Sequence, residues 1–290
     1  TDSLISFNVN KYKEQVDVQS HIDQSSSIKA DYKLSNNEIE TKIVNGQYSA
    51  SKLHSFERGG LEYELKYILG LPDLDDESDD VVQAGQSGEE IKGSHAGTLI
   101  HGVLERIKEW MNSAGEINEM ILNDCIESLS KETERPLSET IKNRIKTECT
   151  AISRTKLVRG LTENVLSGEH EYSMNLPVED FFMNGIIDVL ITNENGELEV
   201  WDWKTNVVDS EIDFARHLEN YELQMKIYAF FVLLMQPKQK EIKCRLLFTR
   251  LAGDNAEDDD WTHVYKWDRQ EVNEFADEIK SLVARTHINI

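Results

Sequence analysis

Cysteine, proline and long apolar runs are scarce in this sequence of 290 residues. Its three cysteines, Cys125, Cys149 and Cys244, are widely separated and form no C-x-x-C pair, which argues against a zinc site or a disulfide framework. A reducing, cytoplasmic setting is therefore expected. No run of 18 apolar residues occurs and the first residues lack a signal-peptide pattern, so we expect no membrane partner.

Positive charge is also scarce, because 31 Lys and Arg face 54 Asp and Glu and the net charge is −23. Binding to phosphates normally requires Lys and Arg, so this balance is unusual for a protein that acts on nucleic acid. Much of the acidity lies in two runs, 73–80 and 254–260, of a kind that usually forms solvated loops. The one clearly basic region is 131–159.

The residues Asn184 to Asn206 predict a β-hairpin that carries chemically active side chains. Residues 185–191 are apolar except for Asp188, residues 194–196 form a turn signal, and residues 197–204 alternate as a strand does. Asp202 and Lys204 are two positions apart, so they project from the same face of the second strand. Charged strand residues are usually exposed, but Asp188 lies in an apolar run. A buried carboxylate normally pairs with a cation or a metal.

These motifs resemble a known family of nucleases. Gly185-Ile-Ile-Asp188, the hairpin, Asp202-Trp-Lys-Thr205, and a following helix with Tyr221-x-x-Gln224 and Tyr228 are similar to the RecB-like branch of the PD-(D/E)xK nucleases. Upstream, residues 97–105 resemble that family's G-x-x-x-H-x-x-L-E helix, in which His101 takes the place of the metal-binding histidine. All four elements occur in the family's order.

The resemblance implies an α/β fold with a PD-(D/E)xK restriction-endonuclease-like core, a mixed central sheet flanked by helices. It further implies a nuclease domain at 49–290, with a helical insertion at about 113–168 and the catalytic core at about 169–290. Residues 1–48 are polar, with little helical periodicity, and we expect an extended arm or linker there.

The resemblance also implies a divalent metal, Mg²⁺ or Mn²⁺, and a set of site residues. The expected ligands are His101, Asp188, Asp202 and the main-chain carbonyl of Trp203. Glu171 is either a further ligand or an exposed strand residue. Lys204 is expected to orient the attacking water.

The helix that follows the hairpin supplies a second group of expected site residues. Tyr221, Gln224 and Tyr228 share one of its faces, which is either ordinary packing or a face that orients catalytic groups and contacts DNA. His217, one turn earlier, is a further candidate. In the basic region, the expected DNA contacts are Lys142, Arg144, Lys146, Arg154, Lys156 and Arg159.

One cofactor of related enzymes is not expected. Residues 49–72 resemble the opening segment of AddAB-type domains, in which a cysteine is the first ligand of an iron–sulfur cluster. Arg58-Gly59-Gly60 stands where that Cys-Pro would be, and the three clustered cysteines that complete such a site are absent from the sequence. We therefore predict no iron–sulfur cluster.

The function implied is that of a metal-dependent deoxyribonuclease, specifically the nuclease domain of a helicase-nuclease that acts in double-strand-break end processing and recombinational repair. Helicase domains are expected as partners, in the same polypeptide or in a complex. The sequence does not begin with Met, which is compatible with either a piece of a longer polypeptide or a processed product. It contains no G-x-x-x-x-G-K-[ST], so we expect that the chain is not itself the motor. The alternative is a non-catalytic domain that uses the nuclease fold to bind DNA ends or a helicase.

Overall fold

The computed structural model describes residues 46–57, 63–68, 93–132, 137–178, 181–254 and 256–288. All of them belong to one unit, Val44–Ile290. The arm predicted at 1–48 lies outside the described residues up to position 45. The acidic run at 73–80 and the Gly59-Gly60 pair also lie outside them.

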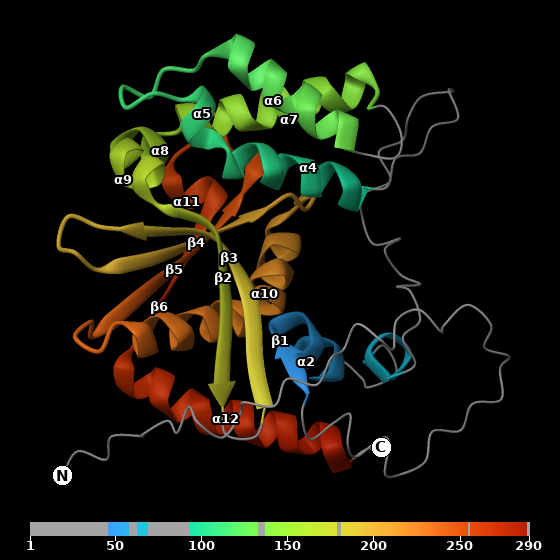
Figure 1. Ribbon diagram of the computed structural model, residues 1–290, viewed down its shortest axis with the longest axis vertical. Coiled ribbons are helices and arrows are strands. Elements are labelled where there is room, and N and C mark those ends of the chain that lie inside the picture. The colour runs from blue at the N-terminus through green and yellow to red at the C-terminus, as the bar shows by residue number, and fades with distance from the viewer. Residues whose placement is uncertain are drawn as a thin grey trace, which may run out of the picture. The chain divides into compact units, whose positions relative to one another are not determined.

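The apolar and β-branched runs form six strands of one mixed sheet (Figure 1). The strand order is β1-β3-β4-β5-β6, and β2 pairs with β3. The β1–β3 and β4–β5 pairs are parallel and the others are antiparallel. This confirms the predicted mixed sheet. The strands are β1 (Gln47–Ser49), β2 (Glu169–Val178), β3 (Phe181–Thr192), β4 (Leu198–Lys204), β5 (Glu241–Phe248) and β6 (Thr262–Asp268).

Strand β3 positions the site because two different strands pair along one of its edges. Its residues 182–184 pair with β1, and its residues 189–192 pair with β4 in the predicted hairpin. Gly196, at the turn, has a φ of 77°, which glycine adopts without strain. Between the two pairings, residues 185–188 have no ladder partner on that edge among the described strands. This gap is where Asp188 lies.

Helices cover both faces of the sheet, and each face has its own apolar core. One face packs against α2 (Ala50–Glu57), α10 (Glu211–Met235) and α12 (Arg269–Ile288). Trp201 and Trp203 face the other core, which the remaining helices complete, so Trp203 points away from Asp202 and Lys204. Figure 1 shows the two helical groups on opposite sides of the sheet. The second group comprises α4 (Gly93–Glu105), α5 (Ile107–Trp110), α6 (Glu119–Glu132), α7 (Glu139–Arg154), α8 (Lys156–Gly160), α9 (Thr162–Ser167) and α11 (Asp258–Trp261).

Helix boundaries follow from local capping. The hydroxyl of Ser210 accepts a hydrogen bond from the N–H of Asp213 at 3.2 Å and begins α10, the helix expected after the hairpin. In the helical region expected at about 113–168, the Thr155 hydroxyl accepts a hydrogen bond from the N–H of Val158 where α7 ends, and the short helices α8 and α9 follow. Two short elements, the π-helix η3 (Glu64–Ile68) and the 3₁₀ helix η4 (Thr249–Leu251), complete the described fold. No helix among the described residues is sufficiently long and apolar to span a bilayer.

Candidate active site

Asp188 is held in the β3 gap by groups from two other elements. Its Oδ2 accepts a hydrogen bond from the main-chain N–H of Trp203 at 2.6 Å, so the carboxylate takes the place of a ladder partner for β4. Its Oδ1 lies 3.4 Å from Nδ1 of His101 on α4. The carboxylate is half-buried, and these two contacts fix its orientation.

Glu171 lies next to Asp188, on the neighbouring strand β2. His170 pairs with Val189 and Tyr172 with Ile187, which leaves Glu171 opposite Asp188. Glu171 has a φ of 51° and is the one described non-glycine residue with a positive φ. That conformation costs a residue with a side chain about 1–2 kcal/mol, and such strain is concentrated at functional sites.

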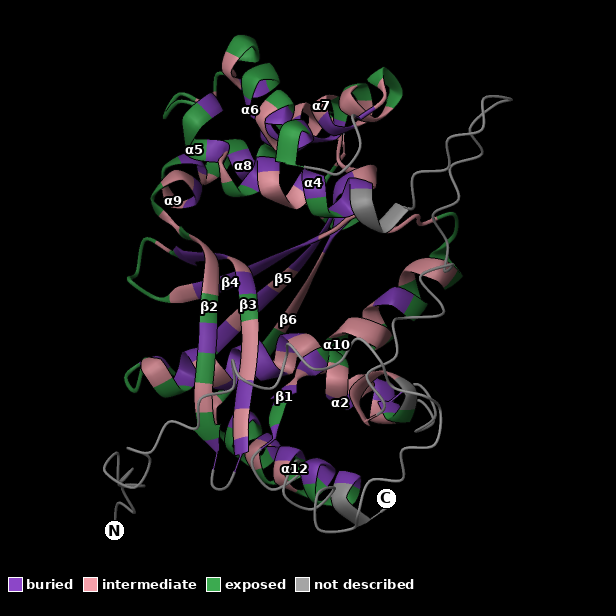
Figure 2. Ribbon diagram, turned by 45° about the vertical axis from the view of Figure 1, so that its right-hand side comes forward, coloured by how far each residue is buried: buried purple, intermediate pink, exposed green. Residues whose placement is uncertain are grey.

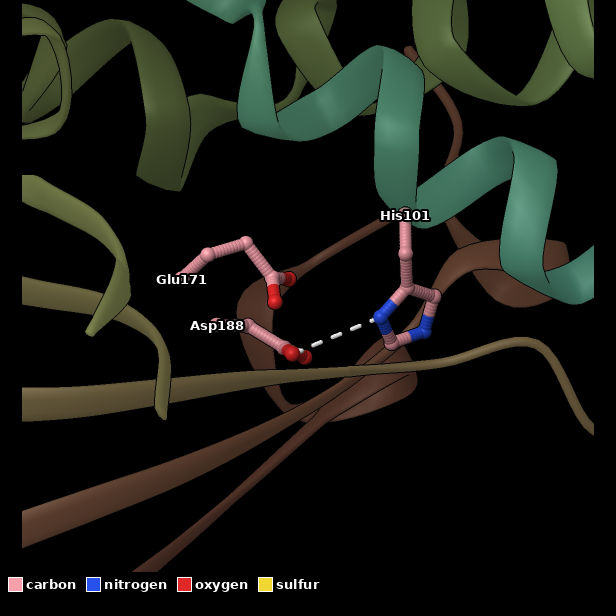
Figure 3. Close-up of side chains that lie close together, drawn as sticks. All are labelled: His101, Glu171 and Asp188. Carbon is pink, nitrogen blue, oxygen red and sulfur yellow. Dashed lines mark ion pairs between the residues drawn. The ribbon is translucent and has the colours of Figure 1, made fainter. Parts of the chain in front are cut away.

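The side chains of His101, Glu171 and Asp188 converge, as Figure 3 shows, and one ligand atom of each lies within 4.8 Å of the other two. Burial raises the pKa of Glu171, and the charge of Asp188 raises it further. Burial opposes charge on His101, but the contact with Asp188 outweighs it and raises the pKa of the imidazole. The electrostatic environment of this cluster therefore favours a positive charge, either on His101 or on a bound cation.

A divalent cation fits this cluster. One imidazole nitrogen and two carboxylates are suitable donors for Mn²⁺, and carboxylates are the donors that Mg²⁺ prefers. A cation between Glu171 and Asp188 would also remove the repulsion that raises the pKa of Glu171. The donor set thus fits the expected metal. Glu171 is half-buried, and its role as a ligand stays a prediction.

Asp202 and Lys204 form an adjacent buried ion pair. Lys204 Nζ lies 2.5 Å from Asp202 Oδ2, and the Asp202 side chain is almost completely buried. Burial raises the pKa of Asp202 to about 6, and Asp188 adds to this effect, while Lys204 partly offsets it. Burial opposes charge on Lys204, but Asp202 outweighs it and raises the pKa of the ammonium. Each charge thus favours the charged form of its partner in this buried pair. Asp202 is not part of the three-residue cluster, and its role as a metal ligand stays a prediction, as does that of the Trp203 carbonyl.

The predicted face of α10 holds Lys204 in place. Lys204 donates to Gln224 Oε1 at 3.0 Å, and its ammonium lies 3.9 Å from the ring centroid of Tyr221. Gln224 Nε2 donates to the Tyr228 hydroxyl at 2.8 Å, which donates to the carbonyl of Ile186 at 2.6 Å. This chain of contacts links α10 to the gap in β3. His217 lies outside this chain. It is buried, and its Nε2 is 3.3 Å from the carbonyl of Val207.

Gly97, Thr205 and Asn206 lie beside the site but were not among the predicted site residues, although Gly97 and Thr205 belong to the matched motifs. The hydroxyl of Tyr221 donates to Asn206 Oδ1 at 2.8 Å, which anchors the ring that faces Lys204. A Cβ at Gly97 would lie 2.6 Å from Thr205 Oγ1, so glycine lets the His101 helix approach the end of β4. Their positions in the sequence could have identified them, because Thr205 and Asn206 directly follow Lys204 and Gly97 precedes His101 by one helical turn.

The basic residues of the helical layer are mostly neutralised by carboxylates. Among the described residues, Arg159 makes no ion pair, whereas the other five expected DNA contacts each have an acidic partner. At those five positions a phosphate would compete with a carboxylate. The pairs are Lys142 with Glu127, Arg144 with Glu148, Lys146 with Glu119, Arg154 with Asp254 and Lys156 with Glu257.

The strain at Glu171 leads to a prediction about stability. Glu171→Gly should raise the free energy of unfolding in metal-free buffer by about 1 kcal/mol, because relief of the left-handed conformation exceeds the entropic cost of glycine. The same change should weaken Mn²⁺ binding. Glu169→Gly, at an exposed residue of β2 without positive φ, is the matched control and should lower stability. Urea unfolding with EDTA and calorimetric Mn²⁺ titration measure both effects. A less stable Glu171→Gly protein would contradict the strain assignment.

The fold and the site together define an α/β protein with a mixed central sheet, helices on both faces and a candidate metal site. The family model of the PD-(D/E)XK nuclease superfamily matches residues 47–289, and the chain therefore belongs to that superfamily.

The solved structures similar to this chain are distant. A protein from Eubacterium rectale described as an exonuclease is 13% identical, with a TM-score of 0.46, and the match covers 89% of this chain and 88% of that one. A phage-related exonuclease from Haemophilus somnus 129PT is 12% identical, with a TM-score of 0.30, covering 65% of this chain and 90% of that one. The comparison with curated proteins found no match. The family assignment rests on the family model.

Proposed function

We propose that this chain is a metal-dependent nuclease that hydrolyses phosphodiester bonds of DNA. The observation that carries the proposal is the cluster of His101, Glu171 and Asp188 beside the buried Asp202–Lys204 pair, in a chain of the PD-(D/E)XK superfamily. Carboxylates alone would repel a phosphate, so they serve this chemistry only with a cation between them.

The residues that would hold the cation are His101, Glu171 and Asp188, with Asp202 and the Trp203 carbonyl as further proposed ligands. A divalent ion bound there supplies Lewis acidity and lowers the pKa of a bound water. Mg²⁺ and Mn²⁺ are the proposed ions, since the donors are mainly oxygen with one imidazole nitrogen.

Lys204 supplies a fixed positive charge for the phosphoryl oxygens. Asp202, Gln224 and the Tyr221 ring hold its ammonium from three directions, so little reorganisation is needed when negative charge develops on the phosphate. An ammonium has three N–H donors, and the oxygens of Asp202 and Gln224 occupy two of them, so one donor remains for the attacking water or a phosphoryl oxygen. Burial raises the pKa of Tyr228 well above its ordinary value, so its neutral hydroxyl remains a donor to the Ile186 carbonyl.

The finer assignment is also a proposal. The motif order resembles the RecB-like branch, and this supports an exonuclease that works with a helicase in double-strand-break end processing. In the same scheme, helices α6 to α9 belong to the proposed insertion at about 113–168, and residues 169–290 form the catalytic core. DNA and helicase domains are the proposed partners.

Cleavage assays with and without metal test the proposal. The purified chain should degrade DNA in Mg²⁺ or Mn²⁺, and EDTA should abolish the activity, because the carboxylates then repel the phosphate. Single-stranded DNA and duplex ends are the substrates to compare. A protein that takes up Mn²⁺ at the cluster and binds DNA ends, yet cleaves neither substrate, would instead be the non-catalytic binding domain.

A further inference from the structure

One face of the β2–β3 ribbon leads away from the metal cluster, and its described residues beyond the cluster are uncharged. Ser173 pairs with Ile186 and Asn175 with Asn184, so these four side chains continue the row that begins with Glu171 and Asp188. Strand β1 extends the face, because Ser49 pairs with Asn184 and the Asn184 amide donates to Gln47 Oε1 at 3.4 Å. We call Gln47, Ser49, Ser173, Asn175, Asn184 and Ile186 the neutral strip.

The neutral strip is the outward face of the ribbon. Ser173 and Asn175 are exposed, and Ile186 is 50% exposed although it is a large apolar residue. The alternate positions Met174, Met183 and Ile187 are buried in the α10 core. In the second half of β2 and the first half of β3, buried positions are interspersed with more exposed ones, as the colours of Figure 2 show.

Ile186 is placed rigidly next to the cluster. It is two residues from Asp188 on the same strand, a spacing of about 6.8 Å. The Tyr228 hydroxyl binds its carbonyl, and the adjacent Gly185 is so tightly packed that a Cβ would lie 2.9 Å from Met174 Cε. Single exposed apolar residues are common, but this one is fixed beside the candidate active site.

The charge of the strip determines what can approach along it. In a chain with a net charge of −23, a phosphodiester backbone is repelled by most of the surface. Among the described residues, the six members of the neutral strip offer a path to Asp188 without a carboxylate. A duplex is bound mainly through Lys and Arg contacts to its phosphates. The strip itself contains no such residue, and Lys52, whose ammonium donates to the Gln47 carbonyl, contacts only its β1 end. An unpaired strand exposes base faces that pack on apolar side chains and edges that bond to amides.

We propose that the neutral strip is the track of an unpaired DNA strand entering the active site, and that Ile186 packs against the nucleoside next to the scissile phosphate. The proposal rests on the nuclease function and adds to it the substrate form and the residues that bind it. Asn175 and Asn184 bind the bases further along the track.

The test compares two substrates of different length. Single-stranded DNA occupies the metal cluster and the strip, whereas a thymidine p-nitrophenyl phosphodiester occupies the cluster alone. Ile186→Asp and Asn184→Asp should raise KM for single-stranded DNA about tenfold. They should leave kcat for the small ester near the wild-type value. Ile186→Leu, which stays apolar, should retain the wild-type KM.

Ile212→Asp is the matched control. Ile212 is 84% exposed in the first turn of α10, about 18 Å along the helix from Gln224, and an added acid is tolerated at a helix N-terminus. This variant should change neither KM for single-stranded DNA nor kcat for the small ester. An unchanged KM for single-stranded DNA in Ile186→Asp would overturn the track, and so would an equal loss on the small ester. If the wild type cleaves neither substrate, the proposed nuclease function is wrong. Fluorescence anisotropy of labelled single-stranded DNA with the same variants then still measures whether the neutral strip binds the strand.

Discussion

Asp188→Asn is expected to reduce phosphodiester cleavage by at least about 10³-fold, an effect on the scale of losing electrostatic stabilisation of the transition state. The amide removes the negative charge that a divalent ion needs, but its oxygen can still accept the hydrogen bond from the Trp203 N–H. The gap in β3 therefore keeps its structure. Removal of one carboxylate from beside Glu171 also relieves repulsion, so the fold should be retained in metal-free buffer.

Two measurements separate loss of the site from loss of the fold. The rate of DNA cleavage in Mn²⁺ and calorimetric Mn²⁺ titration should both fall to background, while circular dichroism and urea unfolding stay near wild type. Asp277→Asn on α12 makes the same chemical change at an exposed residue that pairs with Lys280, and it should leave all four readouts unchanged. Metal-dependent nicking by Asp188→Asn at a rate close to wild type would remove Asp188 from the site.

Lys204→Met is expected to lower kcat by about 10²–10³-fold while Mn²⁺ binding persists. Methionine keeps the length of the side chain but removes the ammonium that contacts Gln224 and Tyr221. It also leaves Asp202 buried without its cation, which should destabilise the fold by about 3 kcal/mol.

A double variant distinguishes the two effects of this change. In Lys204→Met with Asp202→Asn, no buried charge is left without a partner, so stability should recover while cleavage stays lost. Single-turnover kinetics and urea unfolding of the two single variants and the double variant complete the cycle. Recovery of cleavage together with stability would mean that Lys204 acts through folding rather than on the phosphate.

The parts of the site that follow from local patterns are predictable from the sequence. Alternation and the turn at Gly196 indicate the hairpin that carries Asp188, Asp202 and Lys204. The Tyr221-x-x-Gln224 motif and Tyr228 indicate the helix that follows the hairpin, and Ser210 caps its first turn. The approach of His101 to Asp188 is different, because the two lie 87 residues apart and no local pattern links them. Only the resemblance to a family pattern indicated that contact.

Other features depend on tertiary contacts that leave little trace in the sequence. Strand β1 has three residues, too few for a periodic signature, and it is defined by pairing with β3. The left-handed conformation of Glu171 has no compositional signal, since glutamate is not typical of that region. Local charge counting made the basic helical region a candidate DNA surface, but acidic partners such as Glu119 and Glu257 come from other elements.

The most direct test is to locate Mn²⁺ by anomalous scattering in crystals of the wild-type chain grown with the ion. If His101, Glu171 and Asp188 hold the cation, we expect one strong anomalous peak about 2.1 Å from a donor atom of each residue. In crystals of Asp188→Asn the same peak should be lost. A protein saturated with Mn²⁺ that shows no peak at these three side chains would contradict the metal site and the nuclease mechanism built on it.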